Sequence, residues 1–187
     1  TIGYNLAESG GQRSSPTQIG TDTNWKYAVA GGKGSLSLKT DGTIWTCGYN
    51  FEGFLGLNSQ GNRISSPAQV GTDTDWKQIT GGLQTLGGIK TDGTLWMWGT
   101  GSALMWVNNA PTMRSSPTQM PGTTWKQMSL GKYTGGAIKT DGTLWMWGDN
   151  GQGTLGLNGS GGSPTVNYGS GASSPIQIGT DTTWDDL

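Results

Sequence analysis

The chain has 187 residues and a net charge of −1, with 35 glycines, 10 tryptophans, 1 cysteine and no histidine. Without histidine, a Ser-His-Asp or Cys-His catalytic relay and a histidine-based metal site are excluded; a single cysteine excludes an internal disulfide and a thiolate cluster. The sequence contains no run of basic residues of the kind that binds nucleic acid. It also contains no apolar stretch near the roughly 20 residues that span a bilayer. We therefore expect no enzyme, no cofactor, no bound metal, no nucleic acid and no membrane insertion.

The chain begins within a repeating unit, because Gly3-Tyr4-Asn5 matches Gly48-Tyr49-Asn50. We expect a single domain that starts with the end of a preceding unit, holds three whole units and closes with the start of a following one. The expected bounds are 1–12, 13–63, 64–114, 115–172 with a long loop, and 173–187. Since exposed sheet edges invite pairing, we expect either a longer protein or an oligomer to complete the structure.

Each unit opens with Ser-Ser-Pro, continues with a Trp-Lys pair and then reaches a Lys-Thr-Asp-Gly-Thr segment. The Trp precedes the Asp by the same 16 positions in every unit, from Trp25 to Asp41 in the first. Length varies mainly in the connection from the closing glycine to the next Ser-Ser-Pro. Fixed spacing without insertion indicates a packed core. A period of roughly 50 residues with several short strands is typical of repeat architectures such as propellers.

The Asp-Gly pairs of these segments are strong hairpin signals. Asp-Gly tolerates positive φ at both central residues, so we predict two-residue type I′ turns at Asp41-Gly42, Asp92-Gly93 and Asp141-Gly142. The apolar residues that follow each turn do not alternate with polar ones, which indicates a strand covered on both faces. Cys47 takes the position of a repeated tryptophan and is expected to be buried. The tryptophans interpreted as structural core are Trp25, Trp45, Trp76, Trp96, Trp98, Trp125, Trp145, Trp147 and Trp184.

The order Ser-Ser-Pro-x-Gln, Trp, Gly, TDGTLWxWGxN and GxLGLN resembles the repeat of the regulator of chromosome condensation type (RCC1-like) family. The best copy runs from Ser115 to Asn158, and the resemblance covers nearly the whole chain. It implies an all-β fold, a β-propeller of four-stranded blades, with about three full blades and two partial ones here. Two features depart from the family. Gly34, Thr85 and Thr134 stand where a histidine is common, and the second unit lacks the usual ending.

The acidic residues do not indicate an active site. They fall on repeated turn positions, such as Asp22 and Asp73 in the Gly-Thr-Asp-Thr turns. A catalytic carboxylate is expected to break the repeat instead of following it. The glycine-rich segments match no phosphate-binding loop, because no GxxxxGK[ST] pattern occurs.

Two connections leave the repeat pattern and are the candidate binding loops. Residues 103–108 form an aromatic and apolar cluster of the kind that anchors interfaces, although the tryptophan can instead fold back onto its own blade. Residues 159–172 are rich in glycine and serine, and the alternative is a plain solvated loop. Lys132 and Tyr133 differ from the residues at the same positions in the other units. They either contribute to binding or are only exposed side chains at the start of a strand. The candidate binding residues are Met105, Trp106, Asn108, Lys132, Tyr133, Asn167 and Tyr168.

Two functional hypotheses follow. The repeat sequence is rich in Gly, Ser, Thr and Asn, and in this composition it is similar to repeats of bacterial surface proteins and of tailed-phage virion proteins. This similarity predicts a non-enzymatic structural or adhesive module on a virion or cell surface, which binds other protein chains of a larger assembly or surface glycans. The alternative is a soluble protein-binding regulator, an inhibitor or exchange factor. The founding family member exchanges nucleotide on a small GTPase, but no residues here carry that activity over.

Overall fold

The computed structural model describes residues 15–16, 18–100, 113–150, 153–157 and 171–187. These residues form 12 strands, and nowhere among them does a helix of membrane-spanning length and apolarity occur. The strands are β1 (Trp25–Ala30), β2 (Gly34–Lys39), β3 (Ile44–Gly48), β4 (Ile64–Gln69), β5 (Trp76–Gly81), β6 (Thr85–Lys90), β7 (Leu95–Thr100), β8 (Met113–Gln119), β9 (Trp125–Leu130), β10 (Thr134–Lys139), β11 (Leu144–Gly148) and β12 (Ala172–Gln177).

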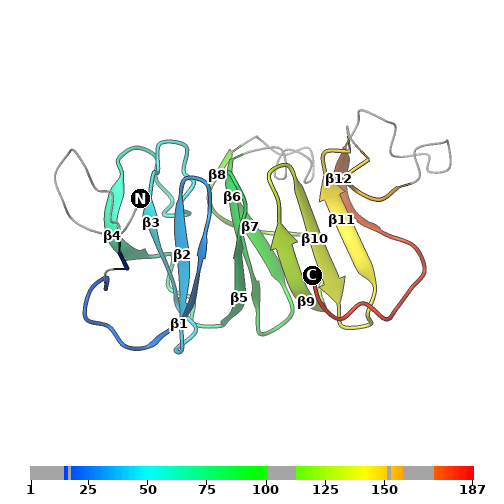
Figure 1. Ribbon diagram of the computed structural model, residues 1–187, viewed down its shortest axis with the longest axis horizontal. Coiled ribbons are helices and arrows are strands. Elements are labelled where there is room, and N and C mark those ends of the chain that lie inside the picture. The colour runs from blue at the N-terminus through cyan, green and yellow to red at the C-terminus, as the bar shows by residue number, and fades with distance from the viewer. Residues whose placement is uncertain (1–14, 17, 101–112, 151–152, 158–170) are drawn as a thin grey trace.

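The strands form three antiparallel sheets of four, in the orders β1-β2-β3-β4, β5-β6-β7-β8 and β9-β10-β11-β12. We call them the first, second and third sheets; they stand side by side with their faces together (Figure 1). The Ser-Ser-Pro segment that opens each sequence unit is the last strand of the sheet before it, as β4 and β8 show. The sequence units and the sheets thus share a period and differ in phase.

The predicted hairpins are present, but the predicted type I′ turn is wrong. In the first sheet the Lys39 amide donates to the Thr43 carbonyl at 3.0 Å and the Gly42 amide to the Lys39 carbonyl at 3.1 Å. Of the turn residues only Gly42 has positive φ, at 80°. This is a three-residue loop, a type I turn followed by a left-handed glycine. The Asp41 carboxylate holds it by accepting from the Thr43 amide and hydroxyl, at 3.0 and 2.7 Å.

Protonation of these turn aspartates is expected to destabilise the chain as pH falls below about 4. Hydrogen bonds from the Thr43 hydroxyl and then its amide lower the pKa of Asp41 below 3.8, and Asp92 and Asp141 have equivalent bonds and lowered pKa values. A pKa lower in the folded than in the unfolded state stabilises the fold above the unfolded value, and that contribution disappears as pH falls through the folded value. Urea midpoints at neutral and acidic pH should differ less in a variant with all three aspartates changed to asparagine. An unchanged difference contradicts the prediction.

Two hydrophobic cores lie between the sheets. The core between the first and second sheets includes Leu36, Leu38, Phe54, Leu86 and Trp98, and the core between the second and third contains Ile89, Met97, Trp125, Met128 and Trp147. In the second sheet, alternate residues of the central strand β7 therefore face opposite neighbours, Met97 the third sheet and Trp98 the first, which explains why the sequence shows no polar alternation there.

The predicted core tryptophans differ in burial. Trp76, Trp98, Trp125 and Trp147 are buried, whereas Trp25, Trp45, Trp96 and Trp145 are partly buried. Trp184, expected in the core, is instead 41% exposed. A tryptophan at this position is covered by strands of its own sheet, as Trp96 and Trp98 cover Trp76, and no described strand follows Trp184. Cys47 is buried as expected.

Each Asp-Gly hairpin tip contacts the Trp-Lys or Trp-Asp tryptophan of the next repeat. The amide of Trp76 donates to the Gly42 carbonyl at 3.2 Å, and Trp125 and Trp184 donate to Gly93 and Gly142 at 3.0 and 3.3 Å. A Cβ atom on Gly42 would overlap the carbonyl oxygen of Thr74. The glycine of the repeated segment is therefore required twice, for its left-handed φ and for the close approach of the next sheet.

The first strands of neighbouring sheets are also linked by side chains. The Tyr27 hydroxyl accepts from the Ile79 amide at 2.8 Å, and Gln78, at the equivalent position, accepts from the Met128 amide at 3.2 Å. Burial raises the pKa of Tyr27, although the bond from Ile79 opposes this effect. Hydrogen bonds as well as apolar contacts thus fix one sheet against the next.

Candidate functional site

A lysine lies over two tryptophan rings at the lower end of every sheet. In the first sheet the Lys39 ammonium is 4.7 Å from the Trp25 ring centre and 4.2 Å from that of Trp45. The Trp45 indole donates to the Thr43 hydroxyl at 2.9 Å. The equivalent lysines, Lys90 and Lys139, have the same arrangement, which we call the lysine–tryptophan cluster. Because it recurs in all three sheets, its first role is structural.

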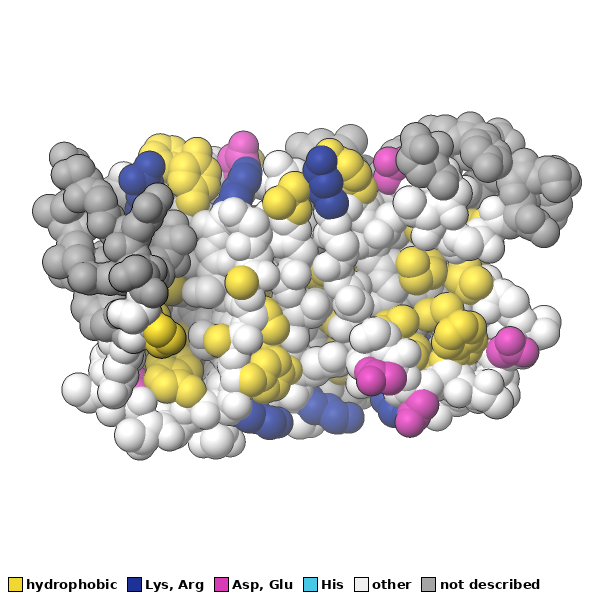
Figure 2. Space-filling view, viewed as in Figure 1, with side chains coloured by type: hydrophobic (Ala, Val, Ile, Leu, Met, Phe, Trp, Pro, Cys, Tyr) yellow, Lys and Arg dark blue, Asp and Glu magenta, His cyan; other side chains and the backbone are white. Residues whose placement is uncertain are grey.

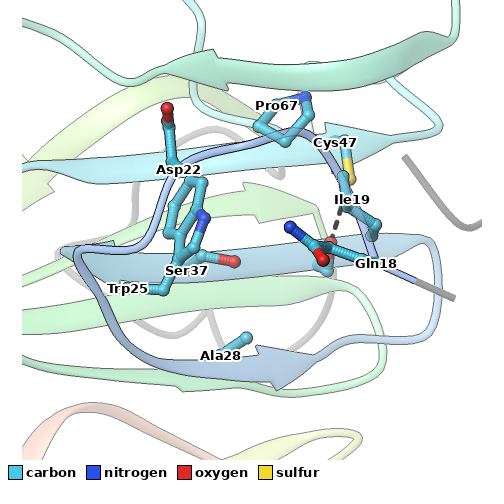
Figure 3. Close-up of a pocket in the computed structure, with 9 residues that line it drawn as sticks. Gln18, Ile19, Asp22, Trp25, Ala28, Ser37, Cys47 and Pro67 are labelled. Carbon is cyan, nitrogen blue, oxygen red and sulfur yellow. Dashed lines mark hydrogen bonds between the residues drawn. The ribbon is translucent and has the colours of Figure 1, made fainter. Parts of the chain in front are cut away.

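A cavity of about 360 Å³ lies on the face of the first sheet that points away from the second sheet (Figure 3). Ser35, Ser37 and Cys47 line it, and the chain segment with Gln18 and Ile19 crosses it. The Ser35 hydroxyl and the Cys47 thiol are 3.1 Å apart. The full lining is Gln18, Ile19, Asp22, Trp25, Ala28, Ser35, Ser37, Cys47 and Pro67.

The position of this cavity in the repeat explains why small side chains line it. On the second sheet, Leu86 and Trp98 occupy the positions of Ser35 and Cys47, and both belong to the core between sheets. The cavity therefore lies on a surface of the kind that packs against another sheet. Its small side chains leave space that a tryptophan fills one repeat later, so we do not assign it a small-molecule ligand.

The opposite end of the sheets carries exposed apolar side chains. Phe51 is 50% exposed, Leu83 42% and Tyr133 39%. They lie in the β3–β4, β5–β6 and β9–β10 connections, and Figure 2 shows apolar, basic and acidic side chains together along this upper edge. We call this surface the upper face and define it by Lys33, Tyr49, Phe51, Glu52, Leu83, Lys132 and Tyr133.

Aromatic and charged groups of the upper face contact one another. The Tyr49 and Phe51 rings are 4.6 Å apart, centre to centre, and the Lys33 ammonium is 5.7 Å from the Tyr49 ring centre. Lys33 also forms an ion pair with Glu52. The hydrogen bond from Lys33 is the main cause that lowers the pKa of Glu52. The charged atoms are thus paired, while the Phe51 ring stays available for contact.

The turns of the three sheets pack into a continuous surface. The Gly32 amide donates to the Gly82 carbonyl at 3.2 Å, which joins the β1–β2 turn to the β5–β6 turn. A Cβ atom on Gly82 would in turn overlap the carbonyl oxygen of Gly131 in the β9–β10 turn. The Leu83 side chain lies against Gly32 of the β1–β2 turn, where a Cβ atom would overlap it, and 42% of its surface stays exposed.

The sequence-predicted binding residues divide into two groups. Lys132 and Tyr133 lie on the upper face, with the Lys132 ammonium 4.6 Å from the Tyr133 ring centre. The remaining candidates fall outside the described residues, namely Met105, Trp106, Asn108, Asn167 and Tyr168. Sequence reasoning missed Phe51 and Leu83. Their signal was an apolar residue at a position that varies between units, since Phe51 aligns with Gly151.

No protein-family model matches the chain, and the comparison with curated proteins found no match. Solved structures are similar to it. Human WBSCR16 matches with a TM-score of 0.67 and 23% identity, over 85% of this chain and 39% of that one. Prp20p from Saccharomyces cerevisiae matches with a TM-score of 0.70 and 17% identity, over 86% and 39%. The chain has the RCC1-type propeller fold. Yeast RCC1 (Prp20) in its complex with Kap60 agrees, with a TM-score of 0.69 and 19% identity, over 86% and 38%.

The RCC1-type similarity confirms the all-β propeller architecture and the RCC1-like repeat predicted from sequence. At these identities it establishes the fold alone. The chain spans 39% of the length of the Prp20p structure, so the three sheets correspond to part of an RCC1-type propeller.

Proposed function

We propose that the chain is a non-enzymatic module of a protein-binding propeller and that the upper face contacts the partner protein. The observation that carries this proposal is the exposure of Phe51, Leu83 and Tyr133 on one continuous surface. Two structures of one neighbour, yeast RCC1 (Prp20), support a protein partner, because one was solved with Kap60 bound and the other is described with binding properties to Gsp1p and histones.

The chemistry of the upper face favours an apolar protein surface as the partner. Aromatic residues are enriched at protein interfaces and buried apolar anchors supply most of their binding free energy. Loops on a rigid scaffold are the usual carriers of binding, and the upper-face residues are located in such connections. The lysines of this face are already held, Lys33 by Glu52 and Lys132 over Tyr133, so they suit a polar rim around the apolar contact.

Replacing Phe51, Leu83 and Tyr133 together with serine is expected to weaken partner binding at least about tenfold, or about 1.4 kcal/mol. Because these side chains are exposed, each change is expected to alter the free energy of unfolding by only about 0.5 kcal/mol. The measurement is quantitative mass spectrometry of proteins retained from an extract of the source organism by the wild type and by the variant, followed by titration of the retained protein.

The matched control replaces three exposed residues away from this face, Thr21, Thr72 and Lys77, with serine. The control should retain the partner as the wild type does. If the upper-face variant still binds every retained protein with wild-type affinity while its urea midpoint is unchanged, the upper face is not the binding surface and the proposal fails.

For the location, we retain the hypothesis of a virion or bacterial surface protein, with a protein or glycan partner. This hypothesis is supported by the near-identical repeat sequences, which are rich in Gly, Ser, Thr and Asn. A soluble regulator, such as an inhibitor or exchange factor, is the alternative. An antibody against the chain distinguishes them: labelling of intact particles or cells supports the surface location, and recovery only in the soluble fraction supports the regulator.

A further inference from the structure

The lysine–tryptophan clusters differ in the carboxylates that face the lysine. In the first sheet the Lys39 ammonium is 2.7 Å from an Asp22 oxygen. In the second sheet the Lys90 ammonium is 2.7 Å from Asp73 and 3.1 Å from Asp75. Burial acts to lower the pKa of Lys90, but the two aspartates outweigh it and raise the pKa. In the third sheet, Lys139 forms no ion pair with a carboxylate of the described residues.

The sequence explains the missing carboxylate. Counted back from the tryptophan that opens each sheet, Gly122 and Thr124 stand at the positions of Asp73 and Asp75. The connection before Trp125 is also one residue shorter than the one before Trp76. Thr124 adopts a φ of 70°, a left-handed conformation that is unfavourable for a β-branched residue. The connection that supplies the counter-ion in the other sheets therefore has a different length, sequence and backbone conformation before Trp125.

Lys139 nevertheless occupies the same place as the other lysines. Its ammonium is 3.9 Å from the Trp145 ring centre and 4.9 Å from that of Trp125. The side chain is only partly buried, whereas Lys39 and Lys90 are buried. The nearby Asp141 carboxylate accepts from the Thr143 amide and hydroxyl, at 3.0 and 2.6 Å, as its counterparts do in all three sheets. Asp141 is therefore not a replacement for the missing carboxylate.

We propose that Lys139, with Trp125 and Trp145, forms a binding site for an external carboxylate, which takes the place that Asp73 has in the second sheet. The two indole rings fix the ammonium and remove part of its water, and a carboxylate paired with a fixed, partly desolvated cation is held more strongly than one paired with a free lysine. The partial exposure of Lys139 leaves the position of the carboxylate open to solvent. The ligand is an acidic side chain of another protein segment or a small free carboxylate. This inference is independent of the upper face.

The test is a titration of the ¹⁵N-labelled full chain, followed by the NMR signals of the tryptophan indole N–H groups at low ionic strength. The probes are sodium acetate and the blocked tetrapeptide Gly-Thr-Asp-Thr, which copies the segment around Asp73. We expect saturable shifts of the Trp125 and Trp145 signals, with smaller and unsaturated changes at Trp76 and Trp96, whose cluster is already occupied. Tighter binding of the tetrapeptide supports an acidic protein segment as ligand, and equal affinity supports a free carboxylate.

Three variants make the test decisive. Lys139→Met should abolish the saturable shifts. Thr124→Asp should weaken tetrapeptide binding at least tenfold by supplying an internal carboxylate, while Thr124→Asn, with the same shape and no charge, should bind as the wild type does. Because the Thr124 pair retains the lysine, it gives a result even if Lys139→Met does not fold. Equal shifts at all three clusters, or equal binding by the two Thr124 variants, would overturn the proposal.

Discussion

Gly42→Ala is expected to lower the free energy of unfolding by about 3 kcal/mol. The new side chain meets two obstacles. A left-handed φ of 80° is unfavourable for alanine, and the Cβ atom would overlap the Thr74 carbonyl, 2.7 Å from its carbon atom. The second obstacle forces the hairpin tip away from the second sheet and weakens the bond from the Trp76 amide to the Gly42 carbonyl. Urea unfolding followed by tryptophan fluorescence and by circular dichroism measures the loss.

Gly71→Ala is the matched control. Gly71 lies in the connection that also contains Thr74 and has a φ of 63°, yet no atom of the part of the chain that the structure describes lies within 4 Å of the position of its Cβ. Only the conformational cost applies there, about 1 kcal/mol. Gly93→Ala should fall between the two, because its nearest contact, the Thr124 amide nitrogen, is 3.1 Å away. Equal losses at Gly42 and Gly71 would show that the contact between hairpin tip and next sheet contributes nothing.

The repeat made the architecture predictable. Identical Lys-Thr-Asp-Gly-Thr segments at fixed distances from the Trp-Lys pairs indicated strands and hairpins, and these are found at β2–β3, β6–β7 and β10–β11. The turn type was not predictable from Asp-Gly alone, because that pair fits both a two-residue turn and a three-residue loop ending in glycine. The Thr43 contacts to the Asp41 carboxylate belong to the three-residue form.

The candidate site was predictable only in part. Lys132 and Tyr133 stood out because they deviate from the other units, whereas Phe51 and Leu83 did not, because an apolar residue in a repeat is first interpreted as core. Their position depends on contacts that are distant in sequence. The Gly32 amide bonds to the Gly82 carbonyl and the Leu83 side chain lies against Gly32, which leaves Leu83 42% exposed at the junction of two turns. Trp184 was predicted to be buried but is exposed, since no described strand covers it.

Trp98→Ala is expected to lower the free energy of unfolding by about 3 to 5 kcal/mol. Trp98 is fully buried in the core between the first and second sheets, with its ring centre 6.0 Å from that of Trp76 and its indole against Gly56. Removing it deletes apolar contacts and leaves a void that surrounding backbone cannot close, because the sheets are fixed by hydrogen bonds such as that from the Ile79 amide to Tyr27. Urea unfolding measures the loss, and hydrogen exchange should show faster opening of the first two sheets than of the third.

Trp98→Phe separates the loss of volume from the loss of the indole N–H. The Trp98 nitrogen has no hydrogen-bond partner among the described residues, so phenylalanine removes an unsatisfied donor while it retains most of the apolar contact. Its expected cost is about 1 kcal/mol. The chain itself contains the small-residue arrangement, because Cys47 occupies this position in the first sheet beside a cavity of about 360 Å³. That space lies on an outward face, whereas Trp98→Ala would place its void between two packed sheets. A cost for Trp98→Ala no greater than that for Trp98→Phe would show that close packing between the sheets is not what holds them together.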